Sequence, residues 1–200
     1  MDTIHLLPTF DNATIPEERS AQRIPRIPLD TSPASRRPQA AISAVADVDA
    51  YNWGYDPYHW AAPEGSYATE GNQDGGARCA EFRQMVGALH EIGLQVVLDQ
   101  VFNHTAAAGQ DKRSVLDRIV PGYYHRLNAA GTIEDSAFGA NTATEHLMTE
   151  RLMIDACVSW VRHYRVDGLR FDLMGYHSVD TMRRSTRSEE RRVGKECRSR

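Results

Sequence analysis

Apolar residues recur every three or four positions in several stretches of this chain, which is the spacing of amphipathic helices. This spacing predicts one helix over residues 78–92, ended by Gly93, and a second over 147–164, ended by Arg165. The alanine-rich residues 39–48 are predicted to form a third, shorter helix. The positions expected to be buried are Cys79, Phe82, Val86 and Leu89 in the first helix, and Leu147, Ile154, Cys157, Val158, Val161 and Tyr164 in the second.

Shorter apolar runs bounded by turn residues predict β-strands. A predicted helix is followed almost at once by such a run, which is typical of βα units that share a parallel sheet. We therefore expect an α/β fold, and the order of the elements indicates a partial (β/α)8 TIM barrel, about strands 1–4 with an inserted loop region. The four predicted strands lie near residues 3–10, within 49–55, and over 94–102 and 166–172.

Segments without periodicity are predicted to be loops. Residues 24–38 contain four prolines, and residues 106–139 form a long excursion with one short helical turn. Insertions after barrel strands usually shape a substrate cleft, so we expect 106–139 on the substrate side. Residues 51–60, YNWGYDPYHW, are rich in aromatic rings and contain Gly54 and Pro57, so neither a strand nor a helix is expected there.

Composition and charge restrict the function only weakly. Of 200 residues, 41% are hydrophobic and 25% are charged, and the formal net charge is −4, as in an ordinary globular protein. The basic residues are scattered and no apolar run is long enough to cross a bilayer, so neither a nucleic-acid nor a membrane partner is expected. No signal peptide is visible, which leaves cytoplasmic and secreted locations open. Cys79, Cys157 and Cys197 have neither disulfide nor metal-site spacing.

Arg170 and Asp172 are the first candidates for chemistry. Side chains alternate along a strand, so these two are expected on one face, with Leu169 and Phe171 on the other. A carboxylate held beside a guanidinium stays ionised at neutral pH, which suits a nucleophile. On these two residues alone, a structural ion pair at a strand end is the simpler interpretation.

Longer motifs point to a known family. The strings VDGLRFDLMGYH (residues 166–177), YNWGYDP (51–57) and APEGSYAT (62–69) closely resemble signatures of type I pullulanases, the starch-debranching members of the α-amylase superfamily (glycoside hydrolase family 13). The resemblance continues through VPGYYHRLNAAGTIEDS and ANTATEH, whereas AFGA between them departs from the cysteine-containing string of that family. Composition alone makes residues 51–60 equally consistent with a sugar platform and with a loop packed by its own rings.

The resemblance implies roles for residues at two strand ends. Asp172 would be the catalytic nucleophile, and Arg170 would keep it ionised and oriented. DQVFNH, residues 99–104, resembles the superfamily motif D-x-x-x-N-H, which implies that Asp99 supports the site and that His104 hydrogen-bonds the sugar.

Further residues receive substrate or metal roles from the same resemblance. Tyr55 would stack on the glucose at the cleaved bond, and Met174 and His177 would lie near the leaving group. No cofactor is required, and in some relatives the residue matching Asn103 ligates a structural calcium ion. The implied partner is an α-glucan polysaccharide.

These roles imply a retaining glycoside hydrolase that cleaves α-1,6-glucosidic branch linkages in pullulan, glycogen or limit dextrins. Such enzymes need a second carboxyl group as acid and base. The family's acid/base Glu belongs to a later strand, and Glu145 and Glu150 match neither motif position, so these 200 residues are predicted to be inactive by themselves. The alternatives are another superfamily member (isoamylase or α-amylase), a non-catalytic glycan-binding homologue or truncated remnant, and a generic α/β domain whose motifs are coincidental.

Residues 187–200 change character abruptly. They carry six basic and three acidic residues but one aliphatic side chain, Val193. A solvated charged tail is one interpretation, but the string also resembles the conceptual translation of a DNA-sequencing adapter. We therefore expect residues 1–186 to be the N-terminal half of a glycosidase (β/α)8 domain and 187–200 to be a non-native tail.

Overall fold

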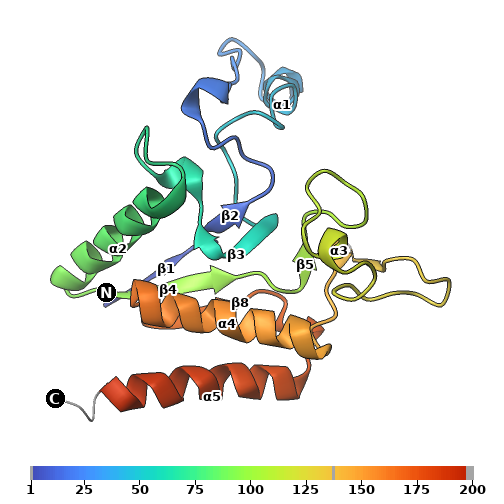
Figure 1. Cartoon of the computed structure of the whole chain (residues 1–200). Coiled ribbons are helices and arrows are strands. Elements are labelled where there is room, and N and C mark those ends of the chain that lie inside the picture. The colour runs from blue at the N-terminus through green and yellow to red at the C-terminus, as the bar shows by residue number, and fades with distance from the viewer. Residues whose placement is uncertain (1, 137, 197–200) are drawn as a thin grey trace.

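The protein has a three-stranded parallel sheet at its centre. The computed structural model describes residues 2–136 and 138–196 (Figure 1). Parallel pairing confirms the expected α/β class, although the described residues contribute three strands to this sheet rather than the expected four. The strand order is β1–β4–β8, formed by Thr3–Leu6, Gln95–Gln100 and Gly168–Phe171.

The strand expected within residues 49–55 is replaced by a turn. Gly54 has a φ of +83°, and its amide donates a hydrogen bond of 2.6 Å to Asn52 Oδ1, so the chain cannot stay extended here. A Cβ on Gly54 would lie 2.6 Å from the carbonyl oxygen of Pro8, so the packing also requires glycine. The prediction of a strand at this place was wrong.

A second pair of strands, which is antiparallel, was not predicted. β2 (Phe10–Asn12) pairs with β3 (Pro57–Pro63), so the aromatic segment is irregular only as far as Asp56. The strand predicted near residues 3–10 is accordingly divided into β1 and β2, with Pro8 between them. Proline lacks the amide hydrogen that a continuous ladder would need at this point.

Two long helices pack together against the parallel sheet. α2 (Gly75–Glu91) buries Phe82 and Val86, as the spacing predicted. α4 (Leu147–Tyr164) has the predicted bounds, and Arg165 ends it in a left-handed conformation with a φ of 58°. α5 (Val179–Glu196) lies against the outer side of α4 (Figure 1). Residues 197–200, with Cys197, lie outside the described residues.

The buried face of α4 differs in part from the prediction. Leu147 is 68% exposed, whereas Met153 and Trp160, which were not predicted, are almost completely buried. Trp160 packs between helix and sheet, and its Nε1 donates to the carbonyl oxygen of Trp60 on β3 at 2.8 Å. The buried face of α4 therefore includes Met153 and Trp160 and leaves out Leu147.

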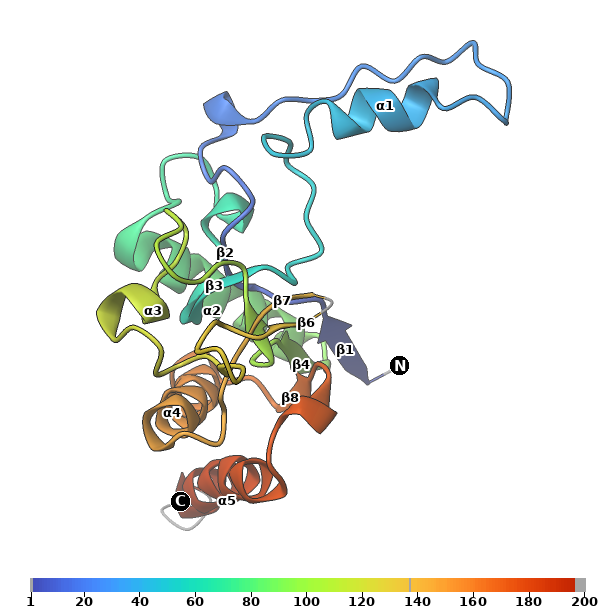
Figure 2. The same cartoon turned by 90° about the vertical axis from the view of Figure 1, so that its right-hand side faces the viewer.

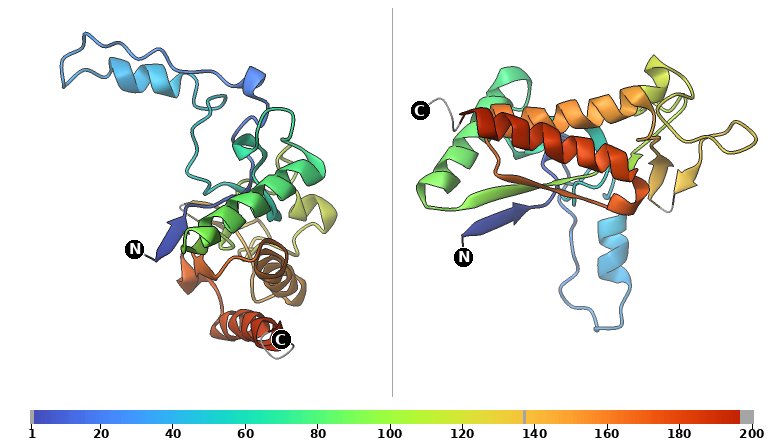
Figure 3. Two further views of the ribbon diagram at one scale, coloured as in Figure 1. Left: turned by 90° about the vertical axis from the view of Figure 1, so that its left-hand side faces the viewer. Right: turned by 90° about the horizontal axis from the view of Figure 1, so that it is seen from below.

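An arm extends away from the sheet between β2 and β3. It contains the short 3-10 helix η1 (Arg19–Ala21), where Arg19 Nη2 donates to the Ala68 carbonyl oxygen at 3.0 Å, and the helix α1 (Arg37–Ser43), which stands clear of the sheet (Figures 2 and 3). Residues 24–36 have no regular structure, as their prolines predicted. α1 begins two residues earlier and ends five residues earlier than predicted, because Pro38 suits a first helical turn.

The inserted region after β4 forms a small antiparallel sheet at the carboxyl end of the parallel strands. Its strand order is β5–β7–β6, and one short helix interrupts it, as predicted. None of the described helices is both long and apolar enough to cross a membrane. The bounds are His104–Thr105 for β5, Leu116–Ile119 for α3, Asp135–Ser136 for β6 and Gly139–Asn141 for β7, and the 3-10 helices η2 and η3 span Gly65–Tyr67 and Met174–Tyr176.

Candidate functional site

Asp99 and Arg170 meet because β4 and β8 are neighbours in parallel register. The two residues are direct partners across the strands, and Arg170 Nη1 donates to Asp99 Oδ1 at 2.8 Å and to Oδ2 at 2.7 Å. The Asp99 side chain is 3% exposed and that of Arg170 is 43% exposed. The hydrogen bond to Asp99 raises the pKa of Arg170 above its already high ordinary value, so this guanidinium is permanently charged.

Asp172 shares the same guanidinium nitrogen. Arg170 Nη1 lies 2.9 Å from Asp172 Oδ1, and the Asp172 amide donates to the carbonyl oxygen of Gln100 at 2.8 Å. Leu169 and Phe171 pack into the apolar clusters, as strand alternation predicted. One nitrogen therefore holds two carboxylates, of which Asp172 is the more accessible.

Tyr55 joins this group from the turn before β3. Its hydroxyl donates to Asp99 Oδ2 at 2.9 Å. Burial, together with the hydrogen bond to Asp99 and its charge, raises the pKa of Tyr55 to about 12. The hydroxyl therefore stays protonated at neutral pH and fixes the position of the ring. The turn at Gly54 brings Tyr55 to this place, although Tyr55 is 44 residues from Asp99 in sequence.

The side chain of His104 bonds the backbone of Tyr55. His104 Nε2 bonds the Tyr55 carbonyl oxygen at 2.8 Å, and Nδ1 bonds Asn103 Nδ2 at 2.9 Å. A ring that accepts from the Asn103 amide at Nδ1 must carry its proton on Nε2. Both ring nitrogens are thus engaged within the protein.

A cavity of about 700 Å³ opens beside Asp172. This volume is typical of a small-molecule site. Asp99 and Arg170 are not lining residues, but each contacts one. Asp99 accepts a hydrogen bond from Tyr55, and Arg170 forms an ion pair with Asp172. The lining residues are Leu7, Trp53, Tyr55, Asp56, His104, Phe138, Asp172 and Leu173.

A second cavity of about 700 Å³ adjoins the first, and Met174 and His177 line it. Leu173 lines both cavities and has a φ of +44°, which is unusual for a residue with a branched side chain. This left-handed residue turns the chain directly after Asp172. The structure therefore places Asp172 in one cavity and Met174 in the next. The other lining residues are Arg126, Glu134, Asn141, Glu145, Gly175, Tyr176 and Ser178.

The second cavity contains a charged pair and a neutral histidine. Arg126 donates from Nε to Glu145 Oε1 at 3.0 Å and from Nη2 to Oε2 at 2.8 Å, which lowers the pKa of Glu145. Burial, assisted by the charge of Arg126, lowers the pKa of His177 to about 4. At neutral pH Glu145 is therefore ionised and unsuited to donate a proton, and His177 carries no charge. Glu150 lines neither cavity and bonds Arg184 of α5 at 3.0 Å.

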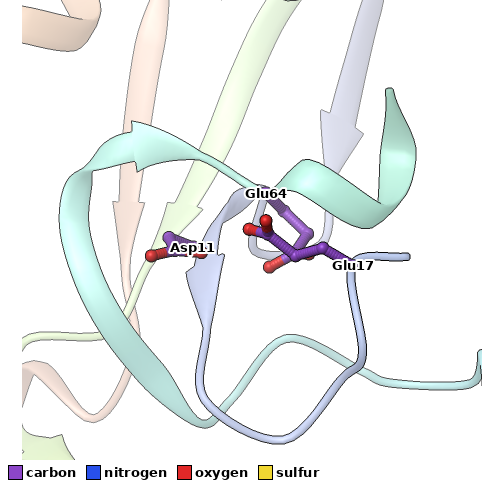
Figure 4. Close-up of side chains that lie close together, drawn as sticks. All are labelled: Asp11, Glu17 and Glu64. Carbon is purple, nitrogen blue, oxygen red and sulfur yellow. The ribbon is translucent and has the colours of Figure 1, made fainter. Parts of the chain in front are cut away.

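Three carboxyl groups gather outside both cavities, where Asp11, Glu17 and Glu64 bring oxygen atoms within 4.8 Å of one another (Figure 4). Arg78 Nη1 lies 2.5 Å from Glu17 Oε1 and 3.8 Å from Asp11 Oδ1. His59 Nδ1 lies 2.5 Å from Asp11 Oδ2. The protein thus supplies cationic or donor groups to this cluster by itself, and the arrangement gives no separate indication of a metal ion.

Asn103 offers a single oxygen atom to the calcium site that the resemblance allows. Its Oδ1 is buried without a hydrogen-bond partner, and amide oxygens are suitable calcium ligands. Calcium takes six to eight oxygen ligands, however. Within residues 2–136 and 138–196, the His, Cys, Asp and Glu side chains with metal-ligand spacing are those of the acidic group described above, which lies outside both cavities. One unpaired oxygen does not make a calcium site.

Arg126, Phe138 and Leu173 are among the cavity residues that were missed in the sequence. Arg126 and Phe138 lie in the inserted region, where no periodicity indicates which side chains face the site. The left-handed backbone of Leu173 has no sequence signal, since glycine and asparagine are the residues typical of that conformation. The family motif next to Asp172 was the only available indication for Leu173.

Comparison with known proteins connects this geometry to one group of enzymes. "Pullulanase 1, chloroplastic" of Arabidopsis thaliana is 48% identical over 180 residues, which cover 86% of this chain and 18% of the relative. A pullulanase of Klebsiella aerogenes is 50% identical over 142 residues, 70% of this chain and 13% of that protein. No family model matches the chain.

Solved structures agree with the sequence comparison. The crystal structure of PulA from Klebsiella oxytoca superposes with a TM-score of 0.87 at 36% identity, covering 94% of this chain and 21% of that one. A Klebsiella pneumoniae pullulanase complexed with maltotriose gives a TM-score of 0.85 at 36% identity, with 94% and 21% covered. The chain thus spans about a fifth or less of these relatives.

Proposed function

Because the chain belongs to the pullulanase family, we propose that it carries the nucleophile of a retaining glycoside hydrolase that cleaves α-1,6-glucosidic linkages. The substrates are branched α-glucans such as pullulan, glycogen or limit dextrins. The observation that carries the proposal is the single guanidinium nitrogen shared by Asp99 and Asp172 at a cavity that Tyr55 also lines. A structural ion pair would have no need of an adjoining cavity of ligand size.

In this proposal Asp172 attacks the anomeric carbon of the sugar. Its carboxylate oxygen forms an ester bond to that carbon while the glycosidic bond to the leaving oxygen breaks. Arg170 is the positioning residue, because its Nη1 binds one oxygen of Asp172 and leaves the other available. The partner of Arg170, Asp99, fixes the guanidinium from a buried position.

The tyrosine that Asp99 also binds supplies the sugar platform. The ring of Tyr55 packs on the C–H face of the glucose unit, and the hydroxyl and carbonyl groups of Tyr55 are both held by the protein. His104 contributes through the Tyr55 carbonyl rather than by touching the sugar. Met174 and His177 line the adjoining cavity, which receives the leaving part of the glucan.

Hydrolysis also requires a proton donor for the leaving oxygen, and we propose that these 200 residues do not provide it. Arg126 keeps Glu145 ionised, and Glu150 lines neither cavity. The chain is therefore expected to bind glucan without turning it over.

The test is electrophoresis in a pullulan-containing gel, combined with measurement of maltotriose released from pullulan. We expect retardation in the gel and no release. Release of maltotriose would refute the missing proton donor, and absence of retardation would refute the glucan site. A greater retardation by amylose than by pullulan would favour an α-1,4-acting member of the superfamily.

We further propose that residues 1–186 are a sector of a (β/α)8 barrel and that 187–200 are a non-native tail. The parallel order β1–β4–β8, with helices between successive strands and the site at their carboxyl ends, supports the barrel. The backbone of α5 runs through the boundary as far as Glu196. Resequencing the source DNA beyond codon 186 tests the tail: a different downstream sequence supports it, and the same string in place refutes it.

A further inference from the structure

Phe138 exposes an aromatic ring at the cavity that contains Asp172. It lines this cavity together with Tyr55 and Asp172, and 60% of its surface is exposed. At this exposure much of the ring surface remains available to a ligand in the cavity. The residue lies in the AFGA stretch, where the sequence departs from the family motif, so the resemblance assigns it no role.

The backbone next to Phe138 is fixed against the site itself. β7 pairs with β5, with Asn141 opposite His104 and Ala140 opposite Thr105. A Cβ on Gly139 would lie 2.8 Å from the Thr105 carbonyl oxygen and 2.9 Å from His104 Cδ2, so glycine is needed for β7 to come this close. Gly139 has a φ of +145°, outside the usual range of other residues. Phe138 is therefore placed at the cavity wall by the same histidine that holds Tyr55.

We propose that Phe138 is a glucan-contacting residue of this chain. Its ring packs on the C–H face of a glucose unit that neighbours the unit held at Asp172 and Tyr55. This inference rests on the proposed function of the cavity and adds a binding residue to it. The physical basis is that a sugar face covers apolar ring surface while the hydroxyl groups at its edge remain in water.

Affinity electrophoresis in pullulan-containing gels tests the role of Phe138. Phe138→Ala is expected to weaken the apparent affinity about tenfold, since it removes the whole aromatic contact. Phe138→Tyr, which keeps the ring, is expected to stay within about twofold of the unchanged chain. Phe138→Leu should fall between them, because it retains apolar surface but no planar face.

Two further variants distinguish a specific contact between Phe138 and glucan from a non-specific loss of glucan affinity. Tyr67→Ala is the matched control, because Tyr67 is also an exposed aromatic residue (55%) but does not line the Asp172 cavity. Its retardation should equal that of the unchanged chain. Tyr55→Ala reports on the cavity itself and should lose most of the retardation. Circular dichroism of each variant establishes that the fold is kept.

The outcomes are distinguishable. If Phe138→Ala is retarded as strongly as the unchanged chain while Tyr55→Ala is not, the role of Phe138 is refuted and the glucan cavity stands. If Tyr67→Ala loses as much affinity as Phe138→Ala, the contact is non-specific and the inference also fails. If the unchanged chain shows no retardation, both the proposed glucan-binding cavity and the proposed role of Phe138 are refuted.

Discussion

Replacing Arg170 with methionine should expose how much the shared guanidinium contributes to stability. Asp99 would keep only the 2.9 Å hydrogen bond from Tyr55, with its side chain 3% exposed. Removing one partner of a fully buried ion pair costs about 3–5 kcal/mol, mainly because a buried charge is left uncompensated. The Arg170 side chain is 43% exposed, so water reaches this site and reduces the cost. We therefore expect the free energy of unfolding to fall by about 2 kcal/mol.

Two matched variants test the cause of that loss. Adding Asp99→Asn to Arg170→Met removes the uncompensated charge, so it should recover about half of the lost stability or more. Arg170→Lys should cost less than Arg170→Met. The reason is that one nitrogen, Nη1, makes all three contacts with the carboxylates of Asp99 and Asp172. A lysine ammonium group is also a single nitrogen with a full charge.

Urea unfolding at pH 7, followed by tryptophan fluorescence, measures these differences. An unchanged dependence of unfolding free energy on urea concentration would show that the variants alter stability rather than the denatured state. The reasoning is refuted if Arg170→Met unfolds at the same urea concentration as the unchanged chain. It also fails if the double variant is no more stable than Arg170→Met.

Three further changes are predicted from the structure. Trp160→Phe leaves the Trp60 carbonyl without its 2.8 Å donor and should lower the free energy of unfolding by about 1–3 kcal/mol in urea titrations. Gly54→Ala should cost about 1–3 kcal/mol in the same assay, because the residue has a φ of +83° and touches Pro8. As its control, Gly76→Ala in open space on α2 should be neutral or stabilising by up to about 1 kcal/mol. Burial lowers the pKa of His177 from 6.5 to about 4, so the unfolded chain binds a proton in this range that the folded chain does not. The free energy of unfolding should therefore decrease by on the order of 3 kcal/mol as pH falls from 6.5 to 4. Urea titrations across that pH range measure this decrease, and His177→Asn should remove it.

The sequence predicted the elements whose signals are local. α4 has a regular apolar period over its whole length, and its bounds were predicted correctly. β4 and β8 are apolar runs that end in polar groups, and the alternation of Leu169, Arg170 and Phe171 assigned the faces correctly. The contact between Arg170 and Asp172 followed from their spacing of two.

Features that depend on distant contacts could not be predicted in this way. The turn at Gly54 is set by its approach to Pro8, 46 residues earlier in the chain, and it removed an expected strand. The bond from His104 Nε2 to the carbonyl oxygen of Tyr55 joins residues 49 positions apart, so the motif around His104 gave no sign of it. The positions of Arg126 and Phe138 depend on how the inserted strands pair, and two- or three-residue strands carry no periodicity.

The central claim, that Asp172 is a glycosyl nucleophile, is tested most directly by covalent labelling of this chain with 5-fluoro-α-glucosyl fluoride. An oxygen of the Asp172 carboxylate would bond the anomeric carbon as the carbon–fluorine bond breaks, and fluoride leaves without a proton donor. Mass spectrometry of the intact chain and its peptides should then show one fluoroglucosyl group on the peptide that contains Asp172, and none on Asp172→Asn. An unlabelled chain, or a label that persists in Asp172→Asn, would contradict the assignment.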